Sequence, residues 1–74
     1  MATRRLVEYH LERLKNKNPD IRKDSIEQLR LLGDPAALSA LEHVFHHDEV
    51  LELRLLAQEA GREIFFKQNP SKKG

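Results

Sequence analysis

The sequence has no cysteine and no tryptophan, and its aromatic residues are limited to one tyrosine and three phenylalanines. No disulfide can therefore stabilise the chain, and a domain of this size buries only roughly 60% of the surface that its unfolded form exposes. The core must come from aliphatic packing, and the 39% of apolar residues are mainly leucine, isoleucine, valine and alanine. We predict one small all-α domain.

An excess of one charge is also missing, because 13 basic residues are balanced by 12 acidic ones and the formal net charge is +1. The chain as a whole has no strong field that would attract a polyanion or an acidic partner. No apolar run approaches the roughly 20 residues that span a bilayer, and Arg4 and Arg5 are not followed by an apolar signal core. We expect a cytoplasmic protein with no membrane partner.

The few glycines and prolines indicate where helices begin and end. Asn18 followed by Pro19 is typical of a helix start, because asparagine caps free amides and proline suits the first helical position. Gly33 is predicted to end that helix in the left-handed conformation, with Asp34 and Pro35 starting the next. Because this corner is short, the helices on either side must pack back against each other.

Apolar residues recur every three or four positions in four segments, which predicts four amphipathic helices. They cover about residues 3–15, with Thr3 as the cap, then 19–32, 35–47 and 48–66. The polar residues 68–74 are predicted to be disordered.

One face of each helix is predicted to be buried, while polar residues of the second helix are predicted to face outward. Ala57, Ala60 and Gly61 are small enough to let helices approach closely. The predicted inward residues are Leu6, Val7, His10, Leu11, Leu14, Ile21, Ser25, Ile26, Leu29, Leu32, Ala37, Leu38, Leu41, Val44, Phe45, Leu53, Leu56, Ala57, Ala60 and Ile64, and the predicted outward residues are Arg22, Lys23, Glu27 and Arg30.

The two halves of the chain resemble each other, which is typical of arrays of helix hairpins. Leu11-Glu12 matches Leu41-Glu42, and Ile21-Arg22 matches Leu53-Arg54, with a slightly longer loop in the second half. The sequence therefore predicts a domain over residues 1–67 with one repeat at about 3–33 and another at about 34–67.

The repeated pattern resembles HEAT repeats, in particular those of phycobilisome-lyase-type proteins. The most specific part of the resemblance is the Leu-Gly-Asp-Pro corner at residues 32–35. The remaining residues that carry it are Ile21, Arg22, Ser25, Ile26, Leu29, Ala36, Ala37, Leu38, Leu41, Val44, Leu53, Arg54, Ala57 and Ala60. The resemblance implies a short α-solenoid of two helix hairpins, a fold that presents its second helices to protein partners and rarely performs chemistry.

Asp48 and Arg54 resemble the acid and the arginine that recur in this family. The resemblance implies that the acid accepts hydrogen bonds from helix amides and from an arginine of a neighbouring unit. Asn16 occupies the equivalent position in the first unit and has no charge.

His43, His46 and His47, followed by Asp48 and Glu49, form the densest group of metal-ligand types in the chain. A solvated helix end explains them better, because histidine near a helix carboxyl end interacts favourably with the helix dipole. HEAT-like di-iron hydroxylases use His-Glu dipeptides, and this sequence contains none. We expect no metal and no cofactor.

An enzymatic function has no support in the sequence. There is no cysteine, and the three serines do not lie in a glycine-flanked turn that would expose a nucleophile. We therefore expect no catalytic residue and no enzymatic activity.

A basic group at the first loop, made of Arg13, Lys15, Lys17, Arg22 and Lys23, raises the alternative of a small nucleic-acid-binding domain. Acidic residues are interleaved with these five, and no aromatic platform is available for stacking bases. The pattern favours a solvated helix end over a nucleic-acid site.

The last helix has a second apolar stripe, made of Leu51, Leu55 and Phe66 with Arg62 between them. One helix hairpin cannot cover both stripes, so we expect these four residues to bind a protein partner or a second copy of the chain. The alternative is that the first helix or the tail covers this stripe. We predict a non-enzymatic interaction or scaffold module, the alternative being an accessory subunit of a larger assembly such as a phycobilisome-lyase-type chromophore-loading complex.

Overall fold

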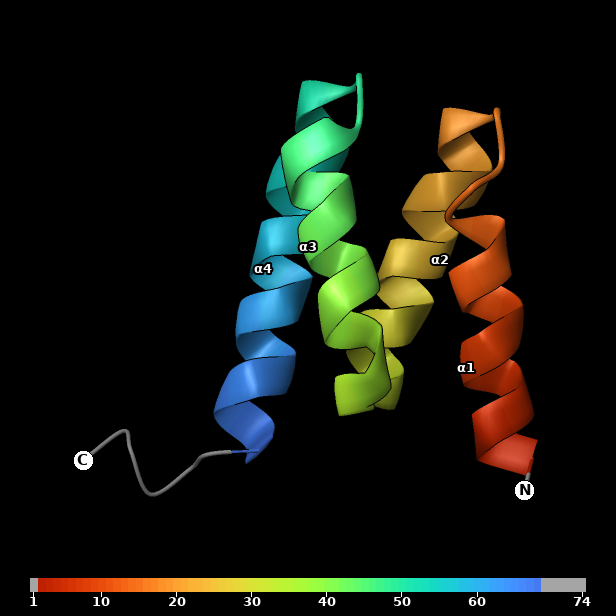
Figure 1. The fold of residues 1–74 in the computed structure, drawn as a ribbon, viewed down its shortest axis with the longest axis vertical. Coiled ribbons are helices and arrows are strands. Elements are labelled where there is room, and N and C mark those ends of the chain that lie inside the picture. Colours follow the sequence, from red (N-terminus) through yellow and green to blue (C-terminus); the bar gives the residue numbers. More distant parts are fainter. Residues whose placement is uncertain (1, 69–74) are drawn as a thin grey trace.

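The computed structural model describes residues 2–68, which form four α-helices and one short 3-10 helix (Figure 1). The elements are α1 (Ala2–Arg13), α2 (Pro19–Leu32), η1 (Pro35–Ala37), α3 (Leu38–His47) and α4 (Leu51–Gln68). No strand occurs among the described residues, so the predicted all-α fold is confirmed. The predicted disordered tail lies outside the described residues, except Gln68, which is the last residue of α4.

The helices are arranged as two hairpins that lie side by side. The first hairpin consists of α1 and α2, and the second consists of α3 and α4 (Figure 1). The main contact between the hairpins is made by α2 and α4, while η1 leads the chain from one hairpin into the other. This is the short α-solenoid expected from the repeated pattern.

The core is aliphatic, and all but one of the predicted inward residues are buried or partly buried. The exception is Leu6, whose side chain is 43% exposed because it lies at the edge of the α1 stripe. The buried apolar residues come from every helix: Val7, Leu14, Ile26, Leu29, Ala37, Leu41, Val44, Leu53, Ala57, Ala60 and Ile64.

Two predictions about individual residues were wrong, one about the orientation of Arg22 and one about the packing at Gly61. Arg22 was expected to face outward, but it is buried, because Asp48 from the second hairpin pairs with its guanidinium. Gly61 was expected to allow close helix packing, but a Cβ atom built there would meet nothing within 4 Å. Gly61 therefore lies on a free surface of α4.

Side chains and glycine set the limits of the helices largely as predicted. The Asn18 side chain accepts a hydrogen bond from the Asp20 amide, and the Asp34 side chain accepts one from the Ala36 amide. Thr3 is not a cap, because it lies within α1. Gly33 ends α2 with φ of 67°, and its amide donates to the Leu29 carbonyl, as expected for a left-handed helix end.

Replacing Gly33 with valine is expected to lower the free energy of unfolding by about 1 kcal/mol or more, because a β-branched residue resists a positive φ. Thermal melts of Gly33→Val and Gly33→Asn would measure this, since asparagine tolerates the left-handed conformation better. Equal melting temperatures for the wild type and Gly33→Val would contradict the assignment of strain to this corner.

Candidate functional site

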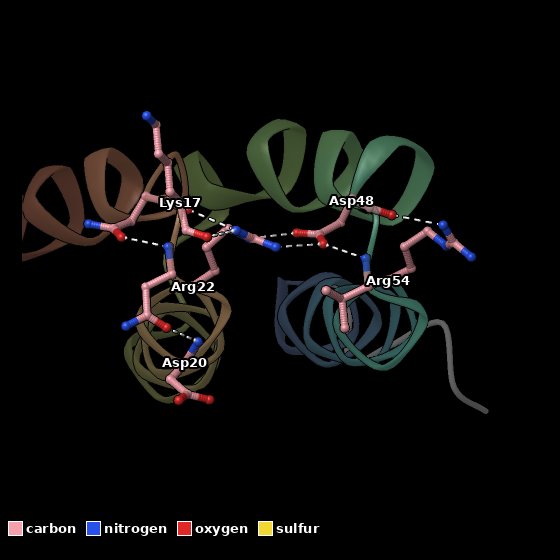
Figure 2. Close-up of polar contacts among 8 residues, drawn as sticks. Lys17, Asp20, Arg22, Asp48 and Arg54 are labelled. Carbon is pink, nitrogen blue, oxygen red and sulfur yellow. Dashed lines mark hydrogen bonds and ion pairs between the residues drawn. The ribbon is translucent and has the colours of Figure 1, made fainter.

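A buried ion pair between Arg22 and Asp48 joins the two hairpins (Figure 2). Nε of Arg22 donates to one carboxylate oxygen at 2.9 Å, and Nη2 donates to the other at 3.0 Å. The two side chains are only 10% and 5% exposed. This bidentate geometry gives both strength and a fixed orientation.

The same two residues also hold the loops at the ends of the hairpins. Nη1 of Arg22 donates to the backbone carbonyls of Asn16 and Lys17, at 2.8 and 3.1 Å. The Asp48 carboxylate accepts from the Val50 amide at 2.9 Å, and Nη1 of Arg54 donates to the Asp48 carbonyl at 2.8 Å. We call this set of contacts the Arg22–Asp48 clamp.

The clamp keeps Asp48 ionised. Burial by itself raises the pKa of this carboxyl group, but the hydrogen bonds from Arg22 and from the Val50 amide, together with the charges of Arg22 and Arg54, lower the pKa below its ordinary value. A carboxyl group whose pKa is lowered by folding stabilises the protein above its unfolded pKa, and this stabilisation is lost as the pH falls through the folded pKa.

Asp48→Asn is expected to lower the free energy of unfolding by about 2 kcal/mol at pH 7, because Arg22 loses its buried ionic partner. The difference from the wild type should begin to shrink below about pH 4, where the Asp48 carboxyl group of the unfolded chain takes up a proton, and should disappear as the pH falls through the lower pKa of the folded protein. Urea unfolding of both proteins at pH 7 and pH 3 would measure it. A difference that does not change between these pH values would mean that the charge of Asp48 has no role.

A second buried polar group lies between α1 and α2. Nε of Arg13 donates to the hydroxyl oxygen of Ser25 at 3.1 Å, and the same oxygen lies 3.1 Å from Nδ1 of His10. Because this oxygen accepts from Arg13, the serine proton is available to an unprotonated Nδ1. Burial, and then the positive charge of Arg13, lower the pKa of His10 against the opposing effect of Asp24, so the neutral imidazole is favoured.

The wild-type protein should therefore lose stability as the pH falls below about 6.5, since unfolding releases His10 to take up a proton. The lowered folded pKa means that the stabilisation is complete above the unfolded pKa and is lost below it. Melting temperatures between pH 7.5 and 5 should fall more for the wild type than for His10→Gln. Parallel curves for the two proteins would exclude His10 as the source.

The predicted partner-binding residues lie on the outer face of α4. Leu51, Leu55 and Phe66 are 58%, 53% and 47% exposed, and Arg62 is also exposed. Neither α1 nor any other described element covers them.

An open groove between α3 and α4, with a volume of about 340 Å³, includes two of these residues. Arg62 and Phe66 line the groove, whereas Leu51 and Leu55 do not. The sequence prediction missed the other groove residues, because no single-helix pattern shows which residues of two helices meet. They are Leu38, Leu41, Glu42 and Phe45 from α3, and Ala57, Gln58, Gly61 and Phe65 from α4.

Gly61 was the available signal for this groove. Glycine inside a helix costs about 1 kcal/mol relative to alanine, and the packing of the described residues does not require it, since a Cβ atom would meet nothing within 4 Å. The missing side chain leaves the floor of the groove open.

The histidines near the end of α3 interact with one another and with the helix. The rings of His43 and His47 stack with centroids 4.4 Å apart, and His46 lies 3.8 Å from Glu42. Among residues 2–68 no three histidine, aspartate or glutamate side chains are placed to hold a metal ion. These three histidines lie on the exposed carboxyl-terminal part of α3.

The basic residues at the first loop do not form a free patch. Arg13 pairs with Asp24, Lys15 with Glu12, and Lys23 with Glu52. Arg22 is held by Asp48, so Lys17 alone of the five has no carboxylate partner within residues 2–68. Four of the five basic side chains are thus paired with carboxylates.

Comparison with protein families identifies the class of this fold. A family model described as HEAT repeats matches residues 1–61, and the chain belongs to the HEAT repeat family. HEAT repeats generally mediate protein–protein interaction or scaffolding. The match does not support the narrower phycobilisome-lyase type.

Comparison with curated proteins and with solved structures gave no significant match. None of the described helices is both long enough and apolar enough to cross a membrane.

Proposed function

We propose that this chain is a non-enzymatic protein-interaction module that works in the cytoplasm, and that its contact surface is the outer face of the second hairpin. This surface consists of the α3–α4 groove together with the exposed side chains of Leu51, Leu55, Arg62 and Phe66. The observation that carries the proposal is the open, mainly apolar groove above Gly61.

The chemistry of this surface favours a protein partner over a small molecule or a nucleic acid. Apolar side chains from two helices line a shallow groove, and exposed aromatic rings lie at its edge, as in grooves that accept an amphipathic helix. Arg62 and Glu42 on the groove offer polar contacts of both signs, which suits a protein surface more than a polyanion.

Charged residues on this surface should abolish binding while leaving the fold intact. For the double variant Leu55→Glu and Phe66→Lys we expect a change of less than about 1 kcal/mol in the free energy of unfolding, because both side chains are half exposed. Thermal melts and light scattering would measure stability and association state. A large loss of melting temperature with an unchanged association state would show that these residues belong to the core.

Binding itself can be followed by photo-crosslinking in the source cell, with a photoreactive residue at Gln58 in the groove and, as the control position, at Glu8 on α1. Specific crosslinks to protein should form from Gln58 only, and they should disappear in the double variant. Gly61→Leu should also remove them by filling the groove, whereas Gly61→Ala is the conservative control. Crosslinks that survive both the double variant and Gly61→Leu would overturn the proposal.

A further inference from the structure

The helix α1 is held to the rest of the protein by few buried side chains. It packs mainly on α2 and η1, and Figure 1 shows it at one edge, with α2 between it and the second hairpin. Within residues 3–13 only Val7 and His10 are buried, whereas α4 buries four residues. One of the two side chains that fix α1 can therefore take up a proton near neutral pH.

The network around His10 accommodates only the neutral imidazole. The hydroxyl oxygen of Ser25 accepts from Nε of Arg13 and lies 3.1 Å from Nδ1 of His10, so the serine proton has Nδ1 as its acceptor. A proton on Nδ1 would remove this acceptor and would direct two cations at one buried oxygen. Because Ser25 is 0% exposed, water cannot replace the lost partner.

The other groups around His10 do not offset a second positive charge. On α1, the Tyr9 ring lies edge-on to His10, and its hydroxyl accepts from Arg13. On α2, the Asp24 carboxylate is exposed and already pairs with Arg13 at 3.4 Å, while η1 consists of proline and alanine and has no charge. Burial, and then the charge of Arg13, therefore lower the pKa of His10 against the effect of Asp24.

The second hairpin has no such network at the corresponding positions. Since Leu11 matches Leu41, the counterpart of His10 is Ala40, and the counterpart of Ser25 is Ala57. Ala57 belongs to the apolar core and Ala40 packs against it, and neither can take up a proton. Proton sensitivity at this position is therefore particular to the first hairpin and is not part of the repeated pattern.

The loop that follows α1 is anchored independently of α1. Nη1 of Arg22 donates to the backbone carbonyls of Asn16 and Lys17, and Arg22 is itself held by the clamp. Only Leu14 and Lys15 lie between α1 and this anchored loop. The helix can therefore turn about these two residues without breaking the clamp.

We propose that α1 is a proton-controlled arm. When Nδ1 of His10 binds a proton, α1 detaches from α2 and η1, while the clamp and the second hairpin keep their packing. The open form exposes the apolar side chains of Val7 and Leu11 together with the α2 surface at Ser25. This device is separate from the contact surface proposed on the second hairpin, so either proposal can fail without the other.

The site of protonation can be tested by NMR of the histidine ring nitrogens in the full chain. At pH 7.5 the His10 ring should carry its one proton on Nε2, because Nδ1 accepts from Ser25. A neutral ring with its proton on Nδ1 would take up the second proton at Nε2 without disturbing Ser25. That result would overturn the proposal.

Detachment of α1 as a unit can be measured by amide hydrogen exchange, with protection corrected for the intrinsic pH dependence of exchange. The amides of residues 7–13 should be less protected than those of residues 57–64 in α4, because α1 opens without global unfolding. Between pH 7.5 and pH 5 the protection of α1 should fall by up to about thirtyfold, the limit for one histidine with an ordinary pKa in the open form. Equal protection of the two helices at pH 5 would mean that α1 leaves only on global unfolding, which contradicts the proposal.

Substitutions separate His10 from other titrating groups. In His10→Gln the fall in α1 protection should largely vanish, since glutamine offers Ser25 an acceptor but binds no proton. Arg13→Gln should reduce the fall, because it removes one of the two cations at the serine oxygen. His47→Gln, at an exposed histidine of α3, is the control and should keep the full fall.

The same fall in His10→Gln as in the wild type would show that another group controls α1. Circular dichroism at pH 7.5 establishes that each variant is folded. Should His10→Gln fail to fold, Arg13→Gln decides, and a fall as large as that of the wild type would overturn the proposal.

Discussion

The relative position of the two hairpins depends on the pair of charges formed by Arg22 and Asp48. Burying two charges is costly, and attraction between them offsets that cost only when the remaining donors and acceptors are also satisfied. Here the backbone carbonyls of Asn16 and Lys17 and the amide of Val50 satisfy them. Among the described residues no buried side-chain nitrogen or oxygen lacks a hydrogen-bond partner. The clamp therefore fixes both loops and the register between the hairpins at once.

The other ion pairs between the hairpins have a smaller effect. Lys23–Glu52 and Arg30–Glu63 both connect α2 to α4, at 3.1 and 3.4 Å, but their side chains lie near solvent. Such pairs typically contribute less than about 1 kcal/mol each. Side-chain packing of Ile26, Leu29 and Leu53 holds α2 and α4 within a common core, and the clamp selects the register in which that packing occurs.

Local features of the sequence were enough to predict the helices. They were not enough to predict contacts between residues that are far apart in the sequence. Asn18, Gly33 and Asp34 act within their own turns, so their roles were evident from sequence order. Arg22 was predicted to face outward because arginine is charged. Its position on the helix indicates the opposite, since at 100° per residue it lies between Ser25 and Ile26 on the buried face. Its partner is 26 residues away, so only the fold reveals why the charge can be buried.

The candidate binding surface divides in the same way. Exposure of Leu55 and Phe66 could be inferred from one helical stripe, because that stripe exceeds what a single neighbouring helix can cover. The groove could not be inferred from the sequence, because it depends on how α3 and α4 cross. Their crossing places Phe45 of α3 and Phe65 of α4 in the same groove. Gly61 carries a signal in the sequence, but its significance requires the observation that nothing packs above it.

The outer faces of the two hairpins therefore differ in chemistry. On the first hairpin, Asn16 accepts from the Asn18 amide, and Arg13 lies over the ring of Tyr9 while donating to its hydroxyl. On the second, Arg54 keeps two donors open and Gly61 leaves room beside them. In a stack of helix hairpins each face is covered by the next unit, so these two outer faces offer different chemistry to anything that packs on them.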